Sequence, residues 1–452
     1  MSLILKHRVD KLLCMQRLTF PHIFKFWAPL AATWLMMAVE GPFLAAIIAR
    51  LADPKFNLAA YGVAYSFALI IEAPIIMIMS ASTALVENRF SLIKLRNFTY
   101  WLNGGITCLM LIFLIPHVFF FVTSDLIGLP PEVSQLTFYA TLILLPWPGA
   151  IGYRRFYQGI LIRNNLTRRV AYGTIVRLMT MSCTAIGLYL YGDLSGVVVG
   201  AAALSAGVVS EAAASRIMSW KVTKELMRIE TGEREVTYAG IARFYYPLAL
   251  TSMIALGVHP LVTFFVGQSR SAIESLAVLP VITSLVFIFR SLGLSYQETA
   301  ISLIGRGWHD YDKVKEFAFL LFFSVVAGLG LIAFTPAAEI WFGVISGLSQ
   351  ELTRFSRIPL MIMCIMPGLS VILSFQRAIL VSSHKTAPIT WATIVEVTGI
   401  IAVLAVAIGY LDLKGAVAAT LALVTGRLGA NAFLIPKCAA AVKRQKAVSS
   451  RQ

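Results

Sequence analysis

Charged side chains inside long apolar segments are the positions at which this sequence could do chemistry. Glu40 lies near the end of the first such segment, Glu72 lies within the second, and Arg290 and Glu298 share a later one. A charged group in the hydrocarbon of a bilayer is energetically costly, so such residues usually carry a function or pair with one another. We take these four residues as candidates for ion coupling or gating.

Glu40 is the candidate for a carboxylate that binds and releases a proton. It stands in FWAPLAATWLMMAVEGP (26–42), which is apolar except for Thr33 and Glu40 itself. Proton binding by a carboxylate depends strongly on its surroundings, and an apolar helix is an unusual setting for one. The alternative is a carboxylate that is satisfied by polar neighbours near the outer interface.

Glu72 and Arg290 occupy equivalent places in two similar halves of the chain. The segment 26–42 is echoed by FYYPLALTSMIALGVHP (244–260), which lies 218 positions later, and the same offset carries Glu72 onto Arg290. Each half would aim its residue at a central axis. The pair is either a gate or coupling element that breaks during transport, or a structural ion pair that positions the halves.

A second polar group lies on the fourth apolar segment and recurs on the tenth. On a helix, Arg154, Tyr157 and Gln158 share one face, because they are three and four residues apart. Arginines here could attract an anionic solute or a lipid head group from the cytoplasm, or they could snorkel to the cytoplasmic interface. The members that we assign to a substrate cavity are Arg154, Arg155, Tyr157, Gln158, Gln376 and Arg377.

Three further residues complete the predicted cavity. Thr33 and Thr251 match under the 218-residue offset, and His259 precedes Pro260. His259 could titrate near neutral pH, or it could be a packing residue. The five cysteines are scattered without metal-ligand spacing, and no phosphate-binding loop, hydrolase or kinase signature is present. We therefore expect no metal, no cofactor and no enzymatic activity.

The elements that must position these residues are membrane-spanning helices. The chain has 452 residues, of which 58% are hydrophobic and 13% are charged, whereas soluble proteins carry roughly 25% charged residues. Crossing a bilayer takes about 20 apolar residues, and each such segment must form its own backbone hydrogen bonds as a helix. The predicted fold is an all-α polytopic membrane protein with twelve spans. We place them at 20–49, 57–82, 98–122, 133–160, 170–190, 195–219, 241–267, 273–301, 317–336, 352–381, 387–410 and 414–436.

The loops between the predicted spans alternate in charge. Alternate loops and both tails hold about two dozen Lys and Arg, and the opposite loops hold about four, which by the positive-inside rule places both termini in the cytoplasm. This bias accounts for the net charge of +16 without a nucleic-acid partner. Six spans in each half make the halves parallel repeats.

The predicted organisation follows from these two observations. Residues 1–19 alternate apolar and basic positions and form either an amphipathic helix on the membrane surface or a disordered basic tail. The predicted segments are the cytoplasmic N-terminus (1–19), a six-helix repeat (20–220), a cytoplasmic connector (221–240), a second six-helix repeat (241–436) and a basic cytoplasmic tail (437–452).

The chain resembles a known group of transporters at this level. Twelve helices in two parallel halves, each with a proline-bearing first helix, are similar to the multidrug and toxin extrusion (MATE) fold, whose superfamily also contains oligosaccharide-lipid flippases. The segments AAYGVAYSF (59–67) and FYYPLAL (244–250), with the first helix that contains Glu40, look most like the progressive ankylosis protein family. The resemblance covers about residues 20–436 of the chain, whose predicted spans it matches in number and order.

The resemblance implies a central cavity and alternating access between its two sides. MATE exporters expel organic cations in exchange for protons or sodium and often use an acidic residue in the first helix, for which Glu40 is the candidate by position. The ankylosis-type relatives are linked to the export of small anions. Where those relatives have a basic residue near the start of the second repeat, His259 stands here.

We therefore predict a secondary active exporter of small organic solutes in the plasma (inner) membrane, driven by a proton or sodium gradient. We expect a monomer whose partners are the solute and the membrane lipids. The first alternative is a flippase for a lipid-linked oligosaccharide or another polyprenyl-linked precursor, with Arg154, Arg155 and Arg377 holding its pyrophosphate group. The second is a membrane scaffold without transport. Arg177 is a similar case to Arg377, while Glu211, Glu396 and Arg427 are further charges within the spans to which the sequence assigns no partner.

Overall fold

The computed structural model describes residues 18–48, 50–127, 129–230, 237–304, 308–346 and 348–449. Within these ranges the elements are helices, and no β-strand is present. The predicted N-terminal amphipathic segment (1–19) lies almost wholly outside them. The first half comprises α2 (Phe20–Ile48), α3 (Pro54–Glu72), η1 (Ala73–Ile75), α4 (Ile78–Leu85), α5 (Arg89–Phe113), α6 (Pro116–Phe120), η2 (Phe121–Leu126), α7 (Pro131–Ile143), α8 (Trp147–Arg163), α9 (Thr167–Tyr191) and α10 (Gly196–Leu226).

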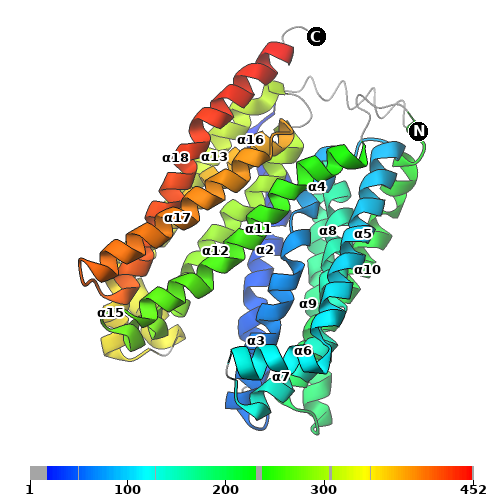
Figure 1. The fold of residues 1–452 in the computed structure, drawn as a ribbon. Coiled ribbons are helices and arrows are strands. Elements are labelled where there is room, and N and C mark those ends of the chain that lie inside the picture. The colour runs from blue at the N-terminus through cyan, green and yellow to red at the C-terminus, as the bar shows by residue number, and fades with distance from the viewer. Residues whose placement is uncertain are drawn as a thin grey trace. The chain divides into compact units, whose positions relative to one another are not determined.

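The second half of the chain is also built of long and short helices, and the longer ones are labelled in Figure 1. It comprises α11 (Tyr238–Gly267), α12 (Ala272–Ile304), η3 (Trp308–Asp310), α13 (Tyr311–Ala333), α14 (Ala337–Glu339), η4 (Ile340–Ile345), α15 (Gln350–Met363), α16 (Met366–Ser382), α17 (Ala387–Gly409) and α18 (Gly415–Ser449).

The described residues contain eleven helical spans long and apolar enough to cross a membrane, or twelve if one bent pair counts as a span. This confirms the predicted all-α polytopic fold. Three spans are made of two helices with a short break, at η1, between α7 and α8, and between α15 and α16. A proline stands at each break, where its missing N–H and its ring prevent a continuous helix; these residues are Pro74, Pro146 and Pro367.

Two predicted spans differ most from the structure. The third span, predicted as one segment over 98–122, turns by 74° between Phe113 and Pro116, so that α6 lies across the end of α5 (Figure 1). The twelfth span was predicted to end at 436, but α18 continues to Ser449 through the segment predicted as a tail. Its last turns carry charged residues, which a helix tolerates once it leaves the hydrocarbon.

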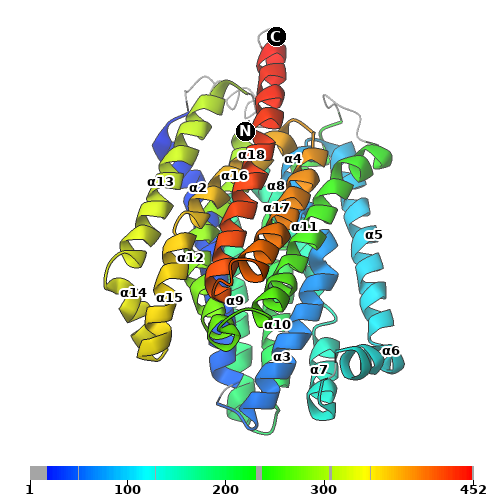
Figure 2. The ribbon, with the colours of Figure 1, turned by 60° about the vertical axis from the view of Figure 1, so that its left-hand side comes forward.

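The chain divides into two compact units, and the division falls inside two helices. One unit contains Met36–Ser252, and the other contains Met1–Leu35 together with Met253–Gln452. Consequently α2 and α11 each contribute their first half to one unit and their second half to the other. In the second unit, the short helix α14 lies against α15 at the end of α13 (Figure 2).

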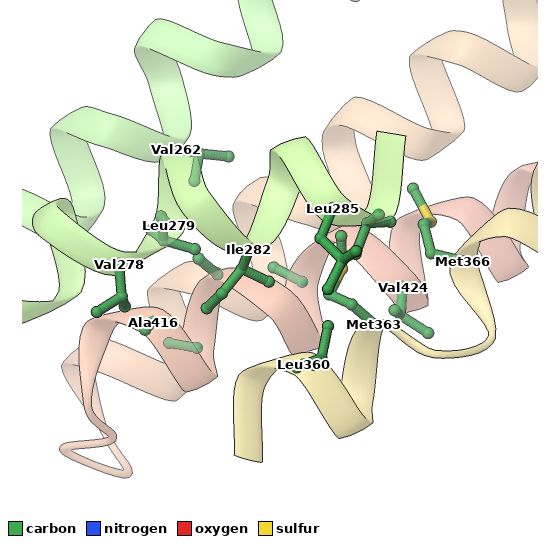
Figure 3. Packing of buried hydrophobic residues seen from close by; sticks show 14 of the residues in the cluster. Val262, Val278, Leu279, Ile282, Leu285, Leu360, Met363, Met366, Ala416 and Val424 are labelled. Atoms are coloured by element: carbon green, nitrogen blue, oxygen red, sulfur yellow. The ribbon is translucent and has the colours of Figure 1, made fainter. Parts of the chain in front are cut away.

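The unit that contains α12 to α18 has a continuous apolar core. Side chains of α12, α15, α16, α17 and α18 interlock there with the end of α11 (Figure 3). Met366 and Val424 lie at one end of the core, and Val278 and Ala416 lie at the other. Packing in the core fixes the rotation of each helix about its axis, and therefore the direction in which its polar face points.

Candidate functional site

A buried ion pair joins α2 to α9. The guanidinium of Arg177 donates from Nη2 to Oε2 of Glu40 across 2.5 Å. Both side chains are enclosed, with 3% of Arg177 and 7% of Glu40 exposed. Glu40 therefore has a cation from another helix as its partner.

Glu211 on α10 is the centre of a larger set of contacts. Its Oε1 accepts hydrogen bonds from Gln158 Nε2 at 3.0 Å and from Thr174 Oγ1 at 3.1 Å. Its Oε2 accepts from the guanidinium of Arg154 and lies 3.5 Å from Nη1 of Arg177. Arg154 is 2% exposed, so the alternative in which it snorkels to the interface is wrong: its charge is held inside the protein by a carboxylate.

We call Glu40, Arg154, Arg177 and Glu211 the glutamate–arginine network. Two carboxylates and two guanidiniums give it a formal charge of zero. Arg177 lies between the two carboxylates, at 2.5 Å from Glu40 and 3.5 Å from Glu211. Among the described residues, Glu40 Oε1 and Arg177 Nε have no hydrogen-bond partner. Removing the charge of Glu40 would leave one positive charge in excess and free Arg177 to move toward Glu211.

Glu72 is connected to this network through an aromatic ring. Trp147, the first residue of α8, donates from Nε1 to Oε2 of Glu72 across 2.5 Å. The guanidinium carbon of Arg177 lies 5.5 Å from the centroid of the same indole, a distance at which a cation is attracted to an aromatic face. The ring of Tyr65 meets the indole edge-on. Trp147 thus holds Glu72 on one side and Arg177 on the other.

A glycine allows α9 and α10 to approach closely enough to build the network. A Cβ added to Gly207 would lie 3.1 Å from the backbone oxygen of Arg177. Gly426 has the same role between α17 and α18, where a Cβ would lie 2.7 Å from the backbone oxygen of Glu396. Small residues at such crossings let membrane helices pack backbone to backbone.

A second group of charges lies in the other unit, on α12, α16, α17 and α18. Nε and Nη2 of Arg427 lie 2.8 Å and 2.7 Å from Oε1 of Glu396. Nη1 of Arg427 donates to Ser370 Oγ at 3.4 Å, and Nε of Arg290 donates to the same oxygen at 3.2 Å. Two guanidiniums therefore converge on one hydroxyl group.

Arg377 on α16 belongs to the same group. Its Nη2 donates to Thr393 Oγ1 at 3.5 Å. The charged residues that act on both Arg290 and Arg377 are Arg427 and Glu396. We call Arg290, Arg377, Arg427 and Glu396 the arginine cluster. With three guanidiniums and one carboxylate, its formal charge is +2.

The predicted pair of Glu72 and Arg290 is divided between the two units. Each residue has a partner within its own unit, namely the indole of Trp147 for Glu72 and the hydroxyl of Ser370 for Arg290. A gate formed by this pair stays a prediction.

The remaining predicted cavity residues have local partners. The hydroxyls of Thr33 and Thr251 donate to the backbone oxygen four residues earlier in their helices, at 3.0 Å and 2.8 Å. The hydroxyls of Tyr157 and Tyr100 lie 3.1 Å apart. Gln376 Nε2 donates to a backbone oxygen of α18 at 3.0 Å. A role of these residues in solute binding stays a prediction.

Three predicted site residues remain. Glu298 is buried on α12, where its Oε1 accepts from Gln297 Nε2 at 3.4 Å. Arg155 is half-buried on α8. The side chain of His259 lies outside the described residues. No group of three His, Cys, Asp or Glu side chains that could hold a metal ion occurs in the part of the chain that the structure describes.

The sequence identified Glu211, Glu396 and Arg427 as charges within the spans without assigning them a partner, and it grouped Arg177 with Arg377. One signal was present in the sequence. At an offset of 219, one residue more than the offset of the first helices, Arg177 falls on Glu396. The structure shows that each of the two has its backbone oxygen against a close-packed glycine. Trp147 gave no such signal, because an aromatic residue at a helix start is common in membrane proteins.

Comparison with known proteins identifies the fold. No protein-family model matches the chain, and no curated protein sequence matches it. A MOP superfamily transporter from Pyrococcus furiosus Vc1, whose binding pocket of reverse polarity suggests a different function, is similar with a TM-score of 0.72 and 16% identity over 94% of this chain and 96% of that one. A multidrug resistance MATE family transporter in an outward-facing conformation gives a TM-score of 0.71 and 16% identity over 94% and 96% of the two chains.

A eukaryotic MATE transporter, AtDTX14, gives a TM-score of 0.71 and 12% identity, and the match covers 94% of this chain and 99% of that chain. These matches span nearly the whole length of both partners. The chain therefore has the fold of the solved MATE transporters, and it is a multi-pass membrane protein. The narrower resemblance to the progressive ankylosis protein family stays a prediction.

Proposed function

We propose that this protein is a secondary active exporter of small organic solutes that works by alternating access and is coupled to an ion gradient. The observation that carries the proposal is the sharing of Arg177 between Glu40 and Glu211, at 2.5 Å and 3.5 Å. Such an arrangement can exist in two states, which involve the same residues and differ in the contacts of Arg177. A proton on Glu40 favours the state in which Arg177 pairs with Glu211, and loss of that proton favours the state with both contacts.

The position of Glu40 connects this switch to a helix that belongs to both units. Glu40 lies in the half of α2 that packs with α3 to α10, while the first half of α2 packs in the other unit. There Trp27 Nε1 donates to Ser295 Oγ at 2.8 Å. Releasing Glu40 from Arg177 removes the ionic contact between α2 and α9. We propose that the resulting movement of α2 is the step that couples ion binding to transport.

We also propose that the two halves are internal parallel repeats, and the starts of α2 and α11 support this. Trp27 Nε1 lies 3.3 Å from the backbone oxygen of Leu292, and Tyr245 Oη donates to the backbone oxygen of Pro74 at 2.6 Å. The 218-residue offset carries Trp27 onto Tyr245 and Pro74 onto Leu292. Each first helix therefore makes the same contact with the second span of the opposite half. Parallel repeats of six spans fit cytoplasmic termini in a plasma membrane.

The rival proposal is a flippase for a polyprenyl-linked precursor. It assigned a pyrophosphate group to Arg154, Arg155 and Arg377. The charge of Arg154 is already balanced by Glu211, which weakens the part of that assignment that rests on Arg154. The partner of Arg377 is the hydroxyl group of Thr393, and the charged residues that act on it are Arg427 and Glu396. The flippase is therefore retained as an outcome of the experiment.

The experiment is solute flux in proteoliposomes under an imposed proton or sodium gradient, with panels of organic cations and organic anions. Wild-type protein should show gradient-dependent flux of at least one compound. Glu40→Gln should abolish the gradient dependence while the protein remains folded. Glu339→Gln is the matched control, because Glu339 is an exposed carboxylate that lies 3.9 Å from an exposed arginine.

Two outcomes would contradict the proposal. Unchanged gradient-driven flux in Glu40→Gln would remove Glu40 from the coupling step. Absence of flux in both panels, combined with scrambling of a polyprenyl-linked lipid, would replace the exporter with the flippase.

A further inference from the structure

The arginine cluster differs in charge from the glutamate–arginine network of the other unit. In the network each guanidinium has a carboxylate oxygen as partner, and the formal charges cancel. In the cluster Arg427 has Glu396, whereas Arg290 and Arg377 donate to the hydroxyls of Ser370 and Thr393. A hydroxyl group satisfies one hydrogen bond but does not balance a charge. The cluster therefore holds two positive charges in excess within a membrane protein.

The place of the cluster in the fold is defined by the apolar core. Arg290 lies one helical turn beyond Val286 of the core, and Arg427 lies one turn beyond Val424. Glu396 lies one turn before Ile400. The charges thus gather at the end of the core at which Met366 and Val424 stand in Figure 3. The helices present them at one level because the core below has already set their rotation.

The cluster also has unused hydrogen-bonding capacity. Arg290 and Arg377 are half-buried rather than enclosed. Nε of Arg377 has no hydrogen-bond partner in the part of the chain that the structure describes, and Arg290 uses its Nε for Ser370. Arg290 and Arg427 share one acceptor, so their donor atoms cannot be farther apart than the sum of 3.2 Å and 3.4 Å. One carboxylate or phosphate group can bridge two guanidiniums that lie this close together.

A purely structural role does not account for this composition. The ion pair of Glu396 and Arg427 is sufficient to tie α17 to α18. Adding two guanidiniums beside it brings like charges together and removes them partly from water, which costs free energy unless an anion compensates them. Arginine is also the residue suited to two-point recognition of carboxylate and phosphate groups.

We infer that Arg290, Arg377 and Arg427 form a binding site for a small oxyanion with at least two negative charges, such as a dicarboxylate, a tricarboxylate or a phosphate. Ser370 holds Arg290 and Arg427 together when the site is empty, and Glu396 orients Arg427. The bound anion takes the hydrogen bonds that Ser370 receives. The inference deepens the proposed function, on which it rests for the transport step, by giving the class of solute.

The experiment measures binding by the purified full-length protein in nanodiscs, without any gradient. Citrate, succinate and inorganic phosphate are titrated by calorimetry, and tetraphenylphosphonium is the cationic comparison. We expect the wild type to bind at least one of the anions. Arg290→Gln and Arg377→Gln should each weaken its binding by about tenfold or more, the loss that follows from removing one charge-assisted hydrogen bond.

Two further variants separate a binding role from a structural one. Arg357→Gln removes one positive charge from an exposed position of the same unit and should leave the affinity within about twofold of wild type, because exposed charges contribute little. If a glutamine variant fails to fold, Arg290→Lys or Arg377→Lys is measured in its place, because lysine keeps the positive charge and with it the fold. They should still weaken binding, since lysine lacks the planar pair of donors.

A second arm distinguishes a free anion from a lipid head group. Nanodiscs of phosphatidylcholine with and without a polyprenyl phosphate are compared by thermal unfolding. Stabilisation by the lipid, lost in Arg290→Gln and Arg377→Gln, would assign the oxyanion to a lipid. No binding of any anion or lipid phosphate, or equal binding by the wild type and both variants, overturns the inference. Anion binding without gradient-driven flux would contradict the proposed exporter function and support the binding site. Gradient-driven flux without anion binding would support the exporter function and overturn the binding site.

Discussion

The coupling between Glu40 and Arg177 can be measured by a double-mutant cycle. The variants are Glu40→Gln, Arg177→Gln and the double substitution. In place of glutamate, glutamine keeps the shape of the side chain and removes its charge. In place of arginine, glutamine gives a shorter, uncharged side chain that is still polar. The pair is 7% and 3% exposed with a separation of 2.5 Å, so solvent screens the interaction far less than at a surface.

The expected magnitudes follow from what each substitution leaves behind. Arg177→Gln leaves Glu40 without its cation in a buried place, and losing one partner of a buried pair costs about 3–5 kcal/mol of folding free energy. Glu40→Gln should cost less, about 1–3 kcal/mol, because Arg177 keeps Glu211 at 3.5 Å. The double variant should be no less stable than Arg177→Gln alone. The coupling energy is then at least the cost of Glu40→Gln, about 1–3 kcal/mol, within the range for residues in one network.

The assay is unfolding by SDS in mixed micelles, followed by helical circular dichroism. The control is the same cycle on Lys446 and Asp312, an ion pair of 3.0 Å whose side chains are 48% and 67% exposed, where coupling should be below about 1 kcal/mol. Additive effects at Glu40 and Arg177, with a coupling energy no larger than that of the control, would refute a shared buried network.

Two further predictions concern the supports of the network. Gly207→Ala should destabilise the protein by about 1–3 kcal/mol, because the new methyl group forces two packed helices apart; Gly187→Ala on α9, where no atom lies within 4 Å of an added Cβ, should be neutral or slightly stabilising in the same unfolding assay. Trp147→Phe keeps an aromatic ring but leaves the buried carboxylate of Glu72 without its donor, and should cost about 1–3 kcal/mol. Trp101→Phe is its control, since Trp101 is 82% exposed, and an equal loss of stability in both variants would contradict the assigned role of the indole.

The sequence was sufficient for the membrane-spanning helices because hydropathy acts locally. An apolar run of about 20 residues has one favourable place, inside the bilayer, and one favourable backbone, a helix. The predicted span at 387–410 and the observed α17 (Ala387–Gly409) differ by a single residue. The bend after Phe113 was not foreseen, since a proline permits a break in a helix without fixing the angle.

The sequence also determined which residues deserved attention. A carboxylate such as Glu40 or Glu72, or a guanidinium such as Arg290, is conspicuous within an apolar segment because its cost in hydrocarbon is large. The sequence could not determine how these charges combine. It associated Glu72 with Arg290 by repeat position, whereas the partners that the structure gives them within their own units are Trp147 and Ser370.

Only the tertiary structure decided the pairing of Arg177 with Glu40 and of Arg154 with Glu211. The residues of these pairs are 137 and 57 positions apart in the chain, so no helical periodicity relates them. Their meeting depends on the rotation of α8, α9 and α10 about their axes and on the close approach at Gly207. Side-chain packing along the whole length of the helices sets both quantities. The sequence therefore supplied the charges and their depth, and the packing of the helices determined which of them are balanced.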